Sequence, residues 1–171
     1  MGEISPQLAD NEAWVDQTFE KCDDILHRQV YLGQGRQEGL LVYVEVAVSN
    51  LMLEEHVIGL SDVQPLKSYE EGKAALLAGN GLLFLDGDTN CYKISSKGYP
   101  GLGVKKAENE KVIRGSQEAF TESEKINVAL IRKRLRDSRM KVEEQTVGVR
   151  SHTMTALVYM EDLIYQGLLT T

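Results

Sequence analysis

The 171-residue sequence has the composition of an ordinary globular domain, with 42% hydrophobic and 26% charged residues. Its longest uncharged stretch, residues 74–85, is shorter than the roughly 20 apolar residues that a helix needs to cross a bilayer. Two cysteines, Cys22 and Cys91, exclude a disulfide scaffold and predict a reducing compartment. The net charge of −7 disfavours nonspecific binding to nucleic acid, so no nucleic-acid partner is expected.

The charge is distributed unevenly along the chain. Residues 1–104 carry 7 basic and 16 acidic side chains, a net of −9, whereas residues 105–171 carry 12 basic and 10 acidic side chains, a net of +2. This asymmetry favours two structural units. Between them lies an unpatterned stretch rich in turn-forming residues. We therefore expect a first α/β unit over residues 1–97, a linker over 98–110, and a second unit over 111–171.

Helices are expected at three places in the first unit. Apolar residues from Trp14 onward recur at spacings of three and four, which predicts an amphipathic helix over residues 11–26. Ser49 is expected to cap a second helix. Residues 68–71 have the Ser-x-x-Glu pattern of a capping box and predict a third helix that ends at Gly79.

The same unit is expected to hold two β-hairpins. One joins residues 29–32 to residues 40–46 through a turn-rich connection. The other joins residues 82–85 to residues 91–94 through an Asp86-Gly87 turn.

The second unit is expected to repeat a helix followed by a hairpin. Thr121 and Glu124 form a further capping box, which predicts that a helix begins at Thr121. A third hairpin is expected from residues 140–147 and 152–159, around Gly148.

An internal repeat is visible at an offset of 116 residues. The LVYVE of residues 41–45 corresponds to the LVYME of residues 157–161, and the same offset places Asn11 on Asn127. The sequence therefore predicts two repeated helix–hairpin–helix units with mixed sheets, arranged as an α/β fold with α+β layering rather than as a doubly wound parallel sheet.

Motifs for catalysis, cofactors or metals are not found. Gly33-x-Gly35 precedes a strand, so it is interpreted as a hairpin turn and not as a phosphate loop. Asp86-x-Asp88-x-Asn90 resembles the start of a calcium loop, but Cys91 and Lys97 stand where Gly and Glu are required. We expect no enzymatic activity, no cofactor and no bound metal.

One basic run stands out over residues 132–141, with six basic side chains and one acid. It is either a solvated helix face whose cations suit the helix C-terminus, or a contact for anionic lipid head groups or an acidic partner surface.

Several ordered motifs resemble the spore germination protein A family. They are EKVIRGSQEAFTES at residues 110–123, NVALIRKRL at 127–135, VGVRS at 147–151 and LVY at 157–159. Ser116, Gln117 and Ala119 depart from the Pro, Arg and Gly that are common there, and Val46 departs from a common Gly. The motif residues taken as candidates for interaction are Arg114, Gly115, Phe120, Asn127, Arg132, Arg134, Arg136, Gly148 and Arg150.

The resemblance implies a non-catalytic, soluble N-terminal region of a germinant receptor A subunit in the inner spore membrane of endospore-forming Firmicutes. Its expected partners are B- and C-type subunits and like subunits, and a small-molecule germinant is a candidate ligand. The region is expected on a soluble face, on the cytoplasmic side. The alternative from the residues alone is a free-standing cytosolic small-ligand-binding or protein-interaction α/β domain.

The repeat also predicts that the second unit is incomplete. Only ten residues follow Glu161, whereas about fifty follow the equivalent strand of the first unit up to the end of its second hairpin. An isolated chain of this kind is expected to self-associate or to expose apolar surface.

Overall fold

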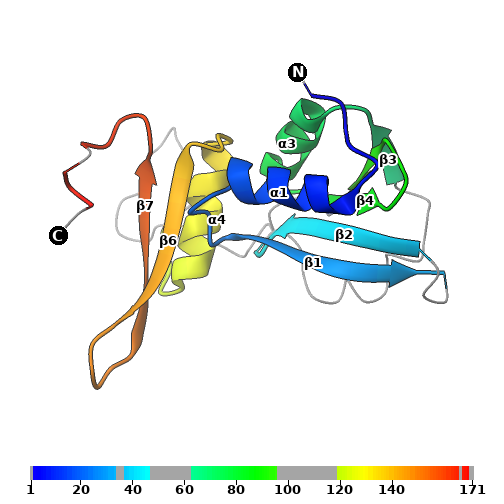
Figure 1. Cartoon of the computed structure of the whole chain (residues 1–171). Helices are drawn as coiled ribbons and strands as arrows, with labels where there is room; N and C mark the ends of the chain where they lie inside the picture. Colours follow the sequence, from blue (N-terminus) through cyan, green and yellow to red (C-terminus); the bar gives the residue numbers. More distant parts are fainter. Residues whose placement is uncertain (1, 34–36, 47–62, 96–118, 166, 170–171) are drawn as a thin grey trace, which may run out of the picture.

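The computed structural model describes residues 2–33, 37–46, 63–95, 119–165 and 167–169. Its strands form two antiparallel sheets (Figure 1), one with the order β1-β2-β4-β5-β3 and one that pairs β6 with β7. The strands are β1 (Ile25–Leu32), β2 (Gln37–Val44), β3 (Val63–Leu66), β4 (Gly81–Leu85), β5 (Cys91–Ile94), β6 (Met140–Val147) and β7 (Thr153–Met160). The mixture of helices and antiparallel sheets agrees with the expected α/β class.

The expectation of mixed sheets is wrong, because every ladder between these strands is antiparallel. The three expected hairpins are present as β1–β2, β4–β5 and β6–β7. Their connections are short, and a short connection joins only antiparallel neighbours. Gly87 and Gly148 have φ of 80° and 90° in the last two turns, which a glycine adopts without steric cost.

Two helices pack on one face of the five-stranded sheet, α1 (Leu8–Thr18) and α3 (Tyr69–Leu77), as Figure 1 shows. Trp14 of α1 stacks on Tyr69 of α3 with ring centroids 4.5 Å apart, and its edge meets Phe84 of β4. Leu40 and Phe84 are cross-strand partners whose side chains belong to this buried core. The aromatic contact therefore joins both helices to the middle of the sheet.

The capping box at the start of α3 is observed with a small change in its second half. The Glu71 amide donates to Ser68 Oγ at 3.3 Å, but the Glu71 carboxylate accepts from the amide of Lys67, one residue before the cap. Gly79 has φ of 89° and ends the helix where it was expected. Both boundaries of α3 thus follow from local sequence.

The helix expected over residues 11–26 is shorter than its apolar spacing suggested. It ends at Thr18, and Leu26 belongs to β1. Lys21 has φ of 59°, and the backbone on both sides of Cys22 pairs with Val142 of β6 instead of continuing the helix. A tertiary contact therefore overrides the helical periodicity.

The capping box predicted at Thr121 is also wrong. The helix α4 (Glu124–Arg134) begins after Ser123, which makes no side-chain capping bond. Thr121 Oγ1 accepts from the Ser123 amide at 3.3 Å, and Asn127 closes the turn by accepting from the Thr121 amide and donating to its carbonyl. The side chain that stabilises this helix start is therefore Asn127, not the Thr–Glu pair.

The helix α4 lies between the two cores. Val128 packs with Met140 and Val142 of β6, whereas Ala129 belongs to the core of the larger sheet. Within the described ranges, no helix combines the length and the apolar content required to span a membrane.

The expected repeat has a counterpart in the element positions. The helices α1 and α4, and the strands β2 and β7, are separated by 116 residues at both ends. Asn11 donates to the carbonyl of Ser5 and Asn127 to that of Thr121, in each case six residues earlier. The helix predicted after Ser49 lies outside the described residues, so the helix–hairpin–helix form of the repeat stays a prediction.

The boundaries proposed for the two units also stay a prediction. The linker over 98–110 lies outside the described residues, as do Arg114 and Gly115. The described residues on its two sides belong to different sheets.

We expect Ser68→Ala to lower the free energy of unfolding by about 1 kcal/mol, because the Glu71 amide loses its acceptor. Urea denaturation monitored by circular dichroism measures this change. Ser123→Ala is the matched control, since Ser123 occupies the same position in α4 without a capping bond. Equal losses in the two variants would contradict the assignment.

Candidate functional site at the junction of the two sheets

A buried ion pair joins the segment before β1 of the five-stranded sheet to α4. Asp24, which precedes β1, accepts from Arg132 of α4 through both carboxylate oxygens, at 2.8 Å from Nε and 2.7 Å from Nη2. The Arg132 side chain is 0% exposed and that of Asp24 is 4% exposed. Arg132 Nη1 also donates to the carbonyls of Asp137 and Met140. All three guanidinium nitrogens therefore donate hydrogen bonds. Two of them bind the Asp24 carboxylate in the bidentate geometry that makes such pairs strong.

The surroundings of Arg132 keep its guanidinium charged. Burial by itself would lower the pKa of Arg132, but the hydrogen bonds and charge of Asp24 outweigh burial and raise it. A charge buried without a partner would cost several kcal/mol, so Asp24 and Arg132 depend on one another.

Backbone hydrogen bonds reinforce the same junction. The Val142 amide donates to the carbonyl of Lys21 at 2.8 Å, and the Asp23 amide donates to the carbonyl of Val142 at 2.9 Å. The Asp23 carboxylate accepts from the amide of Glu144 at 2.7 Å. The segment between α1 and β1 therefore acts as a short parallel neighbour of β6.

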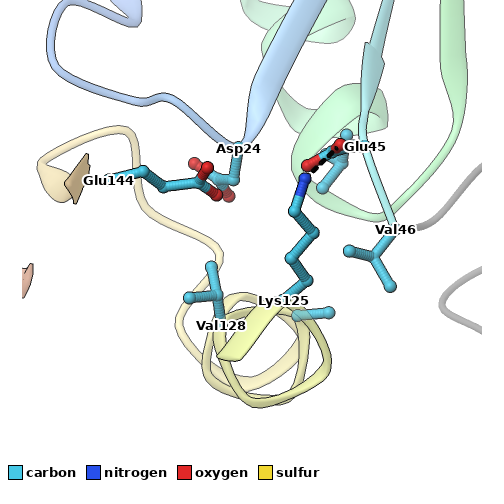
Figure 2. A pocket seen from close by; sticks show the side chains of 8 residues that line it. Asp24, Glu45, Val46, Lys125, Val128 and Glu144 are labelled. Atoms are coloured by element: carbon cyan, nitrogen blue, oxygen red, sulfur yellow. Dashed lines mark hydrogen bonds and ion pairs between the residues drawn. The ribbon is translucent and has the colours of Figure 1, made fainter. Parts of the chain in front are cut away.

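A small hollow lies beside this junction (Figure 2). Its roughly 220 Å³ includes open solvent, and its lining residues come from the ends of β1 and β2, from α4 and from β6. They are Asp24, Val44, Glu45, Val46, Lys125, Val128, Ala129 and Glu144. Lys125 reaches across the hollow to Glu45, with Nζ 2.6 Å from the carboxylate. Four of the lining residues are apolar, three are acidic and one is a lysine.

The charged side chains in and beside the hollow affect one another. Burial, with the nearby charges of Glu45 and Asp23, raises the pKa of Glu144, although Lys125 partly offsets this. The hydrogen bond to Glu45 raises the pKa of Lys125. The hollow therefore contains one cation that is already paired and one carboxylate that is destabilised when charged.

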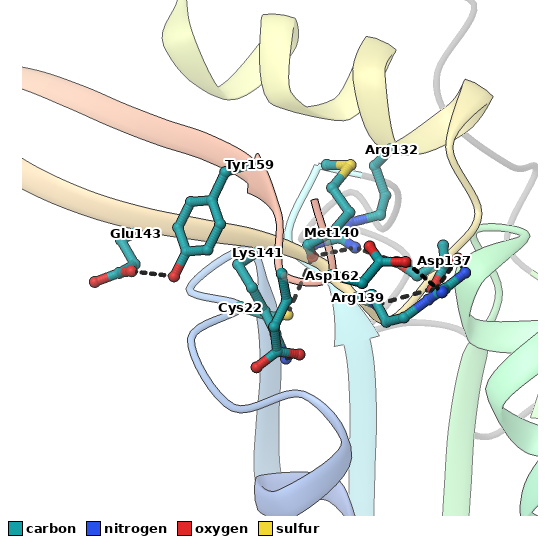
Figure 3. Close-up of polar contacts among 10 residues, drawn as sticks. Cys22, Arg132, Asp137, Arg139, Met140, Lys141, Glu143, Tyr159 and Asp162 are labelled. Carbon is teal, nitrogen blue, oxygen red and sulfur yellow. Dashed lines mark hydrogen bonds and ion pairs between the residues drawn. The ribbon is translucent and has the colours of Figure 1, made fainter. Parts of the chain in front are cut away.

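The basic run over residues 132–141 does not form one exposed face. Arg132 is buried, Lys141 is 4% exposed and lies 3.3 Å from Glu161, and Arg139 pairs with Asp137 and Asp162 (Figure 3). Arg136 is exposed, and its Nε donates to the carbonyl of Lys133. Both interpretations of the run placed Arg132 at the surface, and for this residue both are wrong. It instead joins α4 to the segment before β1 through Asp24.

The other candidate residues are dispersed. Phe120 is 69% exposed, Asn127 stabilises the start of α4, and Arg134 is exposed on the last turn of that helix. Gly148 and Arg150 lie in the exposed loop between β6 and β7. The sequence therefore identified Arg132 but missed its partner, because Asp24 lies 108 residues away and was assigned to a helix.

The two cysteines are not arranged as nucleophiles. Burial raises the pKa of Cys22, whose Sγ donates to the carbonyl of Met140, and burial raises the pKa of Cys91 to about 12. Both remain thiols at neutral pH, whereas the thiolate is the reactive form. Among the described residues, no group of three His, Cys, Asp or Glu side chains is placed to hold a metal ion.

Comparison with known families identifies the family of this chain. The model of the Bacillus/Clostridium GerA spore germination protein family matches residues 13–171. The chain belongs to this family. Its motif series at residues 110–159 thus pointed to the right family from sequence alone.

Relatives in this family are longer proteins. An uncharacterized membrane protein of Bacillus subtilis, YfkQ, is 29% identical over 182 aligned positions, which cover 94% of this chain and 35% of that protein. Stage V sporulation protein AF of the same organism is 33% identical over 60% of the chain and 21% of its own length. Spore germination protein KA is 24% identical over 97% of the chain and 35% of its length. The chain thus spans about a third of YfkQ and of protein KA.

A solved structure has the same fold. The N-terminal domain of the A subunit of the Bacillus megaterium spore germinant receptor GerK3 superposes with a TM-score of 0.74 at 17% identity. The superposition covers 99% of this chain and 70% of that domain.

We expect Asp24→Leu and Arg132→Met each to lower the free energy of unfolding by about 3–5 kcal/mol, because each leaves a buried charge without its partner. The double variant should lose much less than the sum, since it removes both charges. Urea unfolding of the four proteins measures this cycle.

Glu45→Gln is the control for that cycle. It breaks the half-exposed pair with Lys125 and should cost about 1 kcal/mol or less. Additive losses from Asp24→Leu and Arg132→Met would contradict the coupling.

We expect Glu144→Gln to stabilise the protein at pH 7. Because the folded state raises the pKa of Glu144, protonation favours folding, and stability is lost as the pH rises through the folded pKa. The gain from Gln should disappear below pH 4.5, the ordinary value, where both side chains are neutral. Thermal unfolding of the parent and the variant across this pH range measures the stabilisation. Glu122→Gln is the control, because it removes the same charge from an exposed position.

Proposed function

We propose that this chain is the extramembrane N-terminal region of a membrane protein that acts in nutrient-triggered spore germination. The family assignment supports this role, as do relatives named as spore germination proteins. The longer protein would lie in the inner spore membrane, with this region on the cytoplasmic side, and would work with B- and C-type subunits in a multi-subunit receptor.

Within that receptor we propose a non-catalytic role in assembly or in sensing. The observation that supports it best is the Asp24–Arg132 pair, which ties the five-stranded sheet to the α4–β6–β7 unit. Because the pair holds these two parts together, a partner protein would meet both of them in one relative orientation. This geometry supports a structural role in which both parts contact a partner protein.

The hollow at the junction supports the free-standing ligand-binding alternative less well. It has no room for even a molecule the size of water, whereas small-molecule sites usually enclose about 300–1,000 Å³. Its single lysine is already paired with Glu45. Calorimetric titration of the purified chain with nutrient amino acids and sugars would favour this alternative if it showed stoichiometric binding.

The test uses the full-length protein in its own spores. Deletion of the gene should slow the loss of refractility after addition of at least one nutrient mixture. Arg132→Met should reduce either the amount of protein in the spore membrane or the germination response, because it breaks the junction. A fall in the amount indicates assembly, and a lost response at normal amount indicates sensing.

Arg136→Met is the matched control, because it removes an exposed cation from the same run. It should leave both measurements unchanged. A deletion strain that germinates like its parent in every nutrient mixture would contradict the proposed role.

A further inference from the structure

The hairpin of β6 and β7 ends in an arm that projects away from α4 and from the five-stranded sheet (Figure 1). The first three residues of β6 are buried, whereas every residue from Gln145 to Met154 is exposed. We call residues 145–154 the hairpin tip. The family motif singled out Gly148 and Arg150 in this segment, and the junction of the two sheets uses neither of them.

The turn of the hairpin tip has a conformation that its own backbone defines. The His152 amide donates to the carbonyl of Gly148 at 3.1 Å. Gly148 has φ of 90°, and a Cβ at this position would overlap Ser151 Oγ, so the turn requires glycine there. The turn is thus preformed without any contribution from the side chains of Val149 and Arg150.

The turn displays an apolar and a cationic side chain next to each other. Val149 is 93% exposed, and Val147 at the end of β6 is 49% exposed. No hydrogen bond or ion pair joins the exposed Arg150 side chain to another residue that the structure describes. The fold therefore does not account for the presence of Val149 and Arg150 in the turn.

The hairpin tip also differs in charge from the rest of the chain. The chain has 26 acidic residues and a net charge of −7, yet no Asp or Glu occurs from Gln145 to Met160. The three exposed residues at the end of β6 extend the arm by about 10 Å, at ~3.4 Å per residue. The Debye length at physiological ionic strength is ~8 Å. The charge of the acidic body is therefore largely screened from a surface that the tip contacts.

The internal repeat indicates that a later strand beside β7 would leave the tip exposed. In the larger sheet, β4 pairs with β2 over residues 39–42. At the offset of 116 residues these positions correspond to residues 155–158, which lie outside the tip. Tyr31, the counterpart of Val147, is 61% exposed although β4 is in place beside β2. The exposure of the tip thus does not depend on which strand lies beside β7.

We propose that the hairpin tip contacts an anionic lipid bilayer, with Val149 inserted at the level of the head groups and Arg150 bound to lipid phosphate. An arginine donates paired hydrogen bonds to phosphate oxygens, and an anionic surface attracts its charge. The inference rests on the proposed function, because a region of a membrane protein is held close to a bilayer.

The size of the tip favours a bilayer over a protein partner. A stable protein interface uses about 20–30 residues on each side, whereas the tip has ten exposed residues. A weak lipid contact is sufficient when the longer protein already holds the region near the membrane, since tethering raises the effective concentration. The contact fixes the orientation of β6 on the membrane and, through Asp24 and Arg132, that of the five-stranded sheet.

Vesicle binding by the purified chain tests the proposal at physiological ionic strength. Vesicles of equal parts phosphatidylglycerol and phosphatidylcholine should bind the chain more tightly than vesicles of phosphatidylcholine alone. When the anionic vesicles carry a gadolinium-chelating lipid, NMR signals from the amides of Val149 and Arg150 should broaden more than those of α1. Equal binding to both kinds of vesicle, or stronger broadening in α1 than in the tip, would overturn the proposal.

Variants of the tip measure the two parts of the contact. Arg150→Gln should raise the dissociation constant for anionic vesicles about fivefold, which corresponds to ~1 kcal/mol per cation at an anionic surface. Val149→Ser should raise it about threefold or more, because it removes the apolar group from the interface. Arg136→Gln is the matched control, since it removes an exposed cation outside the tip, and screening should keep its effect within about twofold.

Equal weakening by Arg150→Gln and Arg136→Gln would overturn the proposal, because it would assign binding to the overall charge of the chain. A chain that does not bind anionic vesicles at millimolar lipid would also overturn it, and an acidic protein surface would then be the better partner for the tip. None of these measurements involves a response to nutrients. A failure here is therefore distinguishable from a failure of the proposed germination role, which the deletion strain tests.

Discussion

The relation between the two sheets depends on one buried arginine. Arg132 uses three nitrogens to hold Asp24 and two backbone carbonyls, and its side chain has no exposed surface. A guanidinium in such a place is tolerated only when each donor has an acceptor and its charge is balanced. The position of Asp24, and with it the start of β1, is therefore tied to the end of α4. The hollow beside the pair exists because the two units are held together there.

Local features of the fold were predictable because short segments of sequence determine them. Steric limits and hydrogen bonds within a few residues determine the conformation at Ser68, at Gly79 and in the three hairpin turns. The errors occur where distant segments meet. The helix through Leu26 was wrong because pairing with Val142 takes over the backbone after Phe19. The Thr121 box was wrong because Asn127, inside the helix, supplies a better partner for the same turn.

The candidate site was only partly predictable for a related reason. The family motif singled out Arg132, but a linear sequence shows only a cluster of cations and not which of them is buried. Asp24 belongs to no recognisable motif, and it is singled out only by its pairing with Arg132, 108 residues away. Other cations of the run could not be assigned either, because Asp162 and Glu161, which pair with Arg139 and Lys141, follow a later strand.

The long separation between Asp24 and Arg132 has a consequence for synthesis. Asp24 leaves the ribosome well before Arg132, the cation with which it pairs, and β6, which contacts the same segment, emerges later still. At about 5–20 residues per second, the separation of 108 residues takes roughly 5–20 s to translate. During that interval Asp24 is hydrated, and the chain between α1 and β1 has no strand beside it. The Asp24–Arg132 junction therefore forms late in folding. Until then, the segment between α1 and β1 of the nascent chain is exposed to solvent and to other molecules.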